Sequence, residues 1–205
     1  MNQKFHQTVL PFFRLLLFRG TPIEVNGSIP TIVVLAILLV LLVWLGLPSG
    51  DSISPDRDVA SDVRMVFLAI PILAYAIATL MILTVLNIRR FNDRFPKTIS
   101  ACLGLLLLFQ VGAFTLRVVL NSLPTTFEFI SGILGWVLIF WLVGALGYVF
   151  AHSFSLKLYQ GVLAALVISL ISAFLSSILT GMVLPGEVGT LIELQGLSIE
   201  NSSPD

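Results

Sequence analysis

Five long apolar runs constrain this chain more than any other feature of its sequence. A helix needs about 20 apolar residues to cross the roughly 30 Å hydrocarbon core of a bilayer, and each run approaches or exceeds that length. Lipid offers no partner for backbone N–H and C=O groups, and the runs lack the alternation of a barrel strand, so each is predicted to be a helix. The predicted fold class is all-α, a polytopic membrane protein with five transmembrane helices. The predicted spans are residues 29–47, 65–88, 99–120, 127–151 and 158–184.

Composition supports the same class. Of the 205 residues, 57% are hydrophobic and 11% are charged, whereas roughly a quarter of the residues of a soluble domain are charged. The formal net charge is zero, so nothing indicates nucleic acid as a partner. The single cysteine, Cys102, excludes an internal disulfide framework and any site that needs several cysteines.

The distribution of Lys and Arg predicts the orientation, because these residues are retained on the cytoplasmic side. With the N-terminus inside, the inner segments hold eight of the eleven basic residues. Residues 1–28 then form a basic, amphipathic cytoplasmic segment, 29–184 the transmembrane domain, and 185–205 an external acidic tail. One cysteine and no retrieval signal favour a bacterial inner (cytoplasmic) membrane as the location.

Two basic segments are expected on the cytoplasmic side. Residues 5–18 suit a helix lying in the headgroup layer, or a simple positive anchor for the first span. The loop "RRFNDRFPK" could dock an acidic lipid headgroup or protein, but we favour a topological role that holds the hairpin in place. Its cations are Arg89, Arg90, Arg94 and Lys97.

Arg117 is the one ionisable residue well within a predicted span, and intramembrane charges are functional candidates by default. It lies about one turn from the end of its span at Leu120, and Glu128 enters the next span at nearly the same depth. We therefore favour an Arg117 to Glu128 ion pair that clamps the hairpin over a role in transport. Gln110 is expected to hydrogen-bond to a neighbouring helix rather than to a substrate.

A stripe of small residues runs along the fifth predicted span at a spacing of four. Residues four apart share one helix face, and small side chains let helix backbones approach closely. The stripe is therefore predicted to be a helix-packing seam, closed within the chain by small residues of the fourth span. Dimerisation through this stripe is the alternative. Its residues are Gly161, Ala165, Ser169, Ala173, Ser177 and Gly181.

Catalytic and cofactor-binding patterns are missing from the sequence. No span carries Asp or Glu away from its ends, no histidine lies deep in a span, and no glycine-rich phosphate loop is present. Membrane-embedded catalysis needs a nucleophile with a base, paired carboxylates or a metal cluster. We therefore predict a non-enzyme without a cofactor or metal.

The segment "FFRLLLFRGTPIEVNGSIP", which leads into the first of five spans, resembles the bacterial branch of the Yip family, the Ypt/Rab-interacting membrane proteins. That resemblance covers most of the chain at the level of architecture and implies an integral membrane protein with no known catalysis. Eukaryotic relatives bind small GTPases and help to shape or traffic membranes, but this chain lacks their long soluble N-terminal region. No binding residue can be carried over.

The function predicted from sequence is a membrane scaffold or adaptor, or a subunit of a membrane assembly. Its expected partners are the lipid bilayer and another membrane protein or a second copy of the chain. The alternative is a small channel or transporter that uses a kink at Pro71, Gln110 and the hydroxyls of the fifth span.

Overall fold

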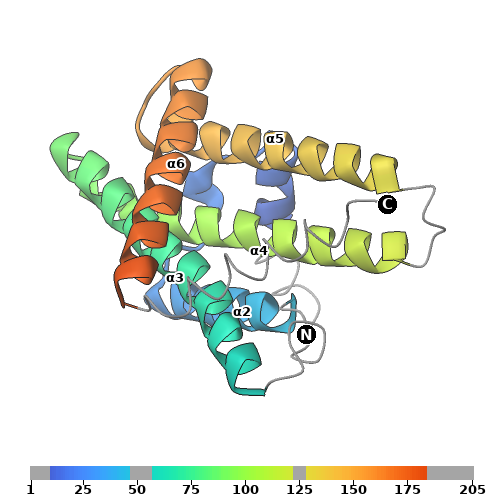
Figure 1. Ribbon diagram of the computed structural model, residues 1–205. Helices are drawn as coiled ribbons and strands as arrows, with labels where there is room; N and C mark the ends of the chain where they lie inside the picture. Colours follow the sequence, from blue (N-terminus) through green and yellow to red (C-terminus); the bar gives the residue numbers. More distant parts are fainter. Residues whose placement is uncertain (1–9, 47–56, 122–127, 184–205) are drawn as a thin grey trace. The chain divides into compact units, whose positions relative to one another are not determined.

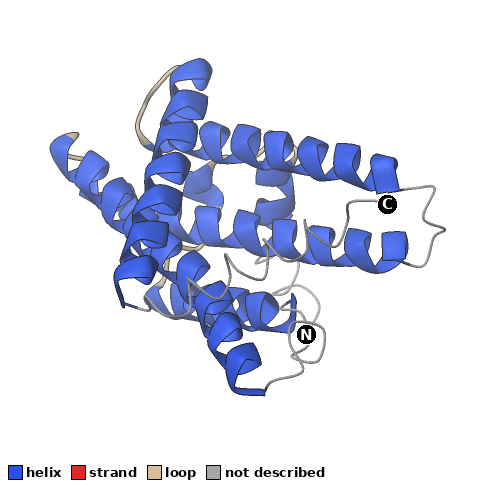
Figure 2. Cartoon of the chain, viewed as in Figure 1, coloured by secondary structure: helices blue, strands red, loops and turns tan. Residues whose placement is uncertain are grey.

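The computed structural model describes residues 10–46, 57–121 and 128–183. Every regular element in this part of the chain is a helix (Figures 1 and 2). A short helical stretch over residues 10–16 precedes the 3-10 helix η1 (Pro22–Glu24). The remaining elements are α2 (Ile29–Gly46), α3 (Arg57–Ile88), η3 (Asn92–Arg94), α4 (Phe95–Asn121), α5 (Glu128–Ser153) and α6 (Leu158–Val183).

The predicted fold class is confirmed: the chain is an all-helical polytopic membrane protein. Four helices of the described residues are long and apolar enough to cross a membrane, and α2 contributes a shorter apolar helix. The four candidate spans are Leu68–Ile88, Asn92–Leu116, Gly132–Ser153 and Leu158–Leu179.

Two predicted loops are shorter than expected, because their helices begin earlier. The second span was predicted to begin at residue 65, but α3 already begins at Arg57. Helix α4 begins at Phe95 instead of Ile99, with Pro96 as its second residue. Proline is tolerated there because the first turn needs no backbone donor. Polar helix ends thus extend beyond the apolar runs.

The chain divides into two compact units. The first contains Met1–Val43 and Thr79–Ile168, and the second contains Trp44–Ala78 and Ser169–Asp205. Helices α4 and α5 lie side by side in the first unit, and η1 packs against both (Figure 1). Fully buried side chains of this unit include Leu15, Leu86, Leu105, Val149 and Phe154.

The N-terminal residues cross this helix pair instead of standing apart from it. Phe12 is buried with its ring against Gly104 of α4, and the Phe18 ring lies 3.5 Å from where a Cβ would stand on Gly144 of α5. Each glycine lies nine residues from the helix end nearer the α3–α4 loop, or about 14 Å at 1.5 Å per residue. The helix predicted over residues 5–18 is described over residues 10–16, and residues 5–9 lie outside the described part. Its place in the headgroup layer stays a prediction.

Candidate functional site

Two arginines of the α3–α4 loop are bound to the end of α5. Arg94 Nη1 donates to the carbonyl oxygens of His152 and Ser153, each at 3.3 Å, and to the Ser155 hydroxyl at 3.0 Å. Arg89 Nη1 donates to the Phe154 carbonyl at 3.2 Å. The last carbonyls of a helix have no partner within it, and the helix C-terminus carries a partial negative charge. The two arginines therefore donate to these free carbonyls and also neutralise the partial negative charge at the end of α5.

A buried pair of hydroxyls continues this contact below Arg94. The Thr98 hydroxyl lies 2.9 Å from the Ser153 hydroxyl and 2.9 Å from the Arg94 carbonyl oxygen. Both side chains are buried, so the Thr98 hydroxyl provides a partner that the Ser153 hydroxyl needs away from water. The guanidinium of Arg94 also lies 4.2 Å from the centre of the Phe91 ring, within range of a cation–π contact.

Three helices of this unit end with a non-glycine residue in the left-handed region. The residues are Phe18, Arg90 and Ser155, with φ of 56°, 60° and 54°. The backbone N–H that follows each one bonds back across the last turn, from Arg19 to Arg14, Phe91 to Leu86 and Leu156 to Ala151. This is the Schellman arrangement, in which glycine is usual. A side chain there costs about 1–2 kcal/mol, so the surrounding contacts hold these ends in place.

Glycines allow α5 and α6 to cross at backbone contact next to the same joint. A Cβ on Gly147 would lie 2.6 Å from Val162 Cα, and a Cβ on Gly161 would collide with the Gly147 carbonyl oxygen. Ala151 adds a second small residue at the crossing. No larger side chain fits, as in other small-residue contacts between membrane helices. We call the arginine caps, the hydroxyl pair and this crossing the basic joint.

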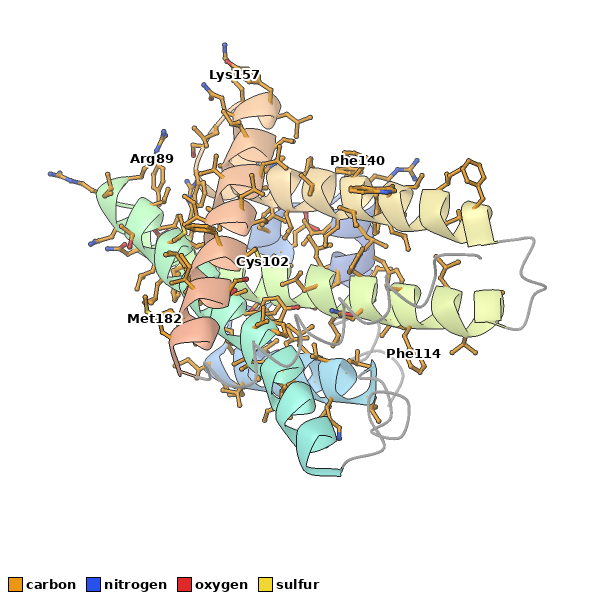
Figure 3. All side chains as sticks on the ribbon, viewed as in Figure 1. Arg89, Cys102, Phe114, Phe140, Lys157 and Met182 are labelled. Atoms are coloured by element: carbon orange, nitrogen blue, oxygen red, sulfur yellow. The ribbon has the colours of Figure 1, made fainter. Side chains whose placement is uncertain are left out.

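The predicted basic loop is thus divided between two environments. Arg89 and Arg94 contact protein carbonyls, as just described. Lys97 packs its backbone against Gly27, where a Cβ would lie 2.7 Å from the Lys97 backbone nitrogen. Within the described residues, the charged ends of Arg90 and Lys97 have no hydrogen-bond or ion-pair partner, and Arg90 is exposed. Figure 3 labels Arg89, which directly follows α3, and Lys157, which directly precedes α6.

The predicted seam on α6 does not remain on one face. Gly161 and Ala165 are buried, whereas Ser169, Ala173 and Ser177 are exposed. The buried positions are instead Gly161, Ala165, Ile168, Ser172 and Ser176. A spacing of four turns the stripe by about 40° per step, because an α-helix has 3.6 residues per turn. The stripe therefore leaves the buried face after two steps.

The hydroxyls of the second half of α6 bond to their own helix. Ser176 and Ser177 both donate to the Ala173 carbonyl at 2.9 Å. Such back-bonding is a usual solution for serine inside a membrane helix. Ser172 is buried and has a polar contact of its own. Use of the exposed Ser169, Ala173 and Ser177 in assembly stays a prediction, as does the role of Gly181, next to which a Cβ would meet nothing within 4 Å.

The predicted Arg117 to Glu128 pair falls on side chains outside the described part of the molecule. The backbone of Arg117 lies in α4, and Glu128 is the first residue of α5. The connecting residues 122–127 are also outside the described ranges. Gln110 is half-buried in α4. The ion pair stays a prediction.

Sequence reasoning missed the partners at the basic joint. Thr98 and Ser153 stand as ordinary polar residues beside apolar runs, and the C-terminal carbonyls of a helix leave no mark in a sequence. One available signal was "AHSFS" after the fourth span, since exposed polar residues after an apolar run mark a helix end. A second was the arginine pair directly after the second span, Arg89 and Arg90, because cations near a helix end can bond to terminal carbonyls.

The chemistry available among these groups is hydrogen bonding and charge neutralisation. Within the described residues, no group of three or more His, Cys, Asp and Glu side chains could hold a metal ion. Comparison with protein-family models, curated proteins and solved structures found no match.

Proposed function

We propose that this chain is a non-catalytic membrane scaffold of the Yip type, which binds other membrane proteins through an exposed helix face. The observation that carries the proposal is the second half of α6. There Ser169, Ala173 and Ser177 present a small, exposed surface, and the Ser177 hydroxyl is already bonded within the helix. A surface of this kind lets a second helix approach closely, and the Ser177 hydroxyl needs no partner from that helix.

The basic joint supports the same proposal in a different way. Its arginines and hydroxyls are engaged with carbonyls and with each other. A rigid joint of this kind holds helices in a fixed arrangement, as a scaffold requires. The unpartnered charges of Arg90 and Lys97 remain available for the anionic cytoplasmic leaflet, which fits the predicted orientation and an inner membrane.

Purification in mild detergent followed by measurement of the native mass tests the scaffold directly. We expect a stoichiometric partner or a stable homodimer, which is lost when Ser169→Leu or Ala173→Leu enlarges the small face. Phe174→Leu is the matched control, because Phe174 is exposed on the neighbouring face and its change leaves the small face intact. A lone monomer that behaves identically in all three variants would overturn the scaffold proposal.

The channel or transporter alternative predicts a different result in the same preparation. Reconstituted liposomes would then show solute flux that depends on Gln110 and Arg117. The Ser176 and Ser177 hydroxyls offer such a path no donor, because both donate to the Ala173 carbonyl. Flux in native protein that is abolished by Gln110→Leu would favour the alternative.

A further inference from the structure

An apolar groove lies in the first unit, between the N-terminal segment, α2 and α4. Its volume is about 390 Å³, within the usual range of about 300–1,000 Å³ for ligand sites. Thr31 contributes the one hydroxyl to the lining. The lining residues are Phe12, Pro30, Thr31, Val34, Leu35, Leu38, Gly104, Leu107 and Leu108.

The groove has a defined direction. Gly27, just before α2, contacts the backbone of Lys97 near the start of α4. Deeper along the two helices, Leu38 of α2 and Leu108 of α4 both line the groove. From Pro30 to Leu38 the lining of α2 rises by eight residue steps, or about 12 Å. The groove therefore runs from the basic end of the unit into the apolar part of the bundle.

Charge near one end of the groove distinguishes possible occupants, because Lys97 packs beside Gly27, three residues before the lining residue Pro30. Lys97 is half-buried, and within the described residues its ammonium has no hydrogen-bond or ion-pair partner. At the same end, the Ser28 hydroxyl lies 2.8 Å from that of Thr31. A cation near one end of an apolar groove complements a molecule with an anionic head and a long apolar tail.

We propose that this groove holds one acyl chain of an anionic phospholipid, with the headgroup at Lys97. A largely apolar lining offers water few hydrogen-bond partners, and a void forfeits the contacts of its lining. Gly104 permits this geometry because the Phe12 ring occupies the space of its missing side chain, which closes one wall. The inference is independent of the proposed scaffold function, since it rests on no residue of α6.

Native mass spectrometry of the full chain, purified from membranes that contain phosphatidylglycerol, tests the proposal. Val34→Trp fills the groove, whereas Val33→Trp adds the same bulk beside it. These two valines are 55% and 49% exposed, which makes the variants a close match. We expect one retained phosphatidylglycerol per chain in the native protein and in Val33→Trp, and about tenfold less in Val34→Trp.

Leu108→Trp is a second groove substitution, and monodispersity on gel filtration shows whether each variant is folded. Lys97→Gln is expected to retain a lipid but to lose a preference of about tenfold for phosphatidylglycerol over phosphatidylcholine, while Arg90→Gln keeps that preference.

Three results would overturn the proposal. Equal lipid retention in the Val33 and Val34 variants would show that the groove is not the site. Equal binding of zwitterionic lipid by the native protein would remove the headgroup contact. A homodimer that Val34→Trp dissociates would identify a second copy of the chain as the occupant.

Discussion

The two ends of the α4–α5 pair differ sharply in how they are held. At the basic joint, arginines cap carbonyls, buried hydroxyls pair, and Gly147 lies against the backbone of α6. Towards the other end, a Cβ added to Gly112, Gly132 or Gly135 would meet nothing within 4 Å. The comparison teaches that small residues have two different roles in one membrane protein, and that the neighbouring backbone decides between them.

Aromatic side chains show the same contrast. Near the joint, Phe150 is buried and stacks on Phe154 with ring centres 5.2 Å apart. Farther from the joint, Phe114 and Phe140 are exposed and project from their helices (Figure 3). The joint provides the packing that fixes the helices, whereas the open end presents apolar surface to lipid or to a partner.

The largest expected effect is at the helix crossing. Gly161→Ala places a methyl group against backbone atoms of Gly147 and Ala151, and overpacking of this kind costs about 1–3 kcal/mol or more. Gly135→Ala meets open space, so it should stabilise α5 by about 0.5–1 kcal/mol through helix propensity alone. Thermal unfolding in detergent checks both signs. Equal shifts for the two variants would remove the contrast between the ends.

The second effect concerns the cap on α5. Arg94→Gln removes the charge from three acceptors, and charge-assisted bonds to such groups contribute about 1.5–3 kcal/mol. Because the site is only part-buried, we expect a loss near 1.5 kcal/mol in the free energy of unfolding. Arg90→Gln is the matched control, since Arg90 is exposed. If both changes have the same effect, the cap is not a specific contact.

How far the sequence predicted the molecule depended on the kind of interaction. Apolar runs identified the helices because the bilayer requires about 20 apolar residues per span. Helix ends were less predictable, as Arg57 and Phe95 show, because polar turns extend into water without changing hydropathy. The crossing at Gly161 followed from small residues. The small-residue stripe of α6 turns away from the buried face after Ala165. A spacing of four does not encode which neighbouring helix covers each residue, so the sequence could not predict this turn.

The basic loop shows a second limit. Its four cations stand close together in the sequence, but the sequence could not say that Arg94 reaches Ser153 while Arg90 remains exposed. These different environments arise because the fold brings the α3–α4 loop next to the end of α5, although the two are far apart along the chain. Charge counting predicts the side of the membrane, whereas the individual contacts require the packed helices.

A third effect should be stabilising. Arg90 has φ of 60°, a conformation that costs a side chain about 1–2 kcal/mol and glycine almost nothing. Arg90→Gly should therefore raise the free energy of unfolding by about 1 kcal/mol, reduced by the greater freedom of glycine in the unfolded chain. Chemical denaturation with Arg90→Ala as the control separates backbone strain from loss of charge. An unchanged or lower midpoint for Arg90→Gly alone would show that this end is not strained.

The smallest effect is expected at the open end. If Arg117 and Glu128 form the predicted clamp near the membrane surface, each single neutralisation costs about 0.2–1 kcal/mol. Exchange of the two residues, Arg117→Glu with Glu128→Arg, should restore most of that loss. A double-mutant cycle on thermal unfolding measures the coupling. Zero coupling would exclude the clamp and leave the basic joint as the main polar contact of the helix pair.

Site-specific photo-crosslinking in native membranes tests the scaffold most directly. A photoreactive residue at Ala173 stands on the small, exposed face of α6, and one at Phe174 stands on the adjacent bulky face. The account predicts a discrete protein adduct, with a partner or a second copy, from position 173, and lipid adducts alone from position 174. Lipid adducts alone from both positions would contradict it.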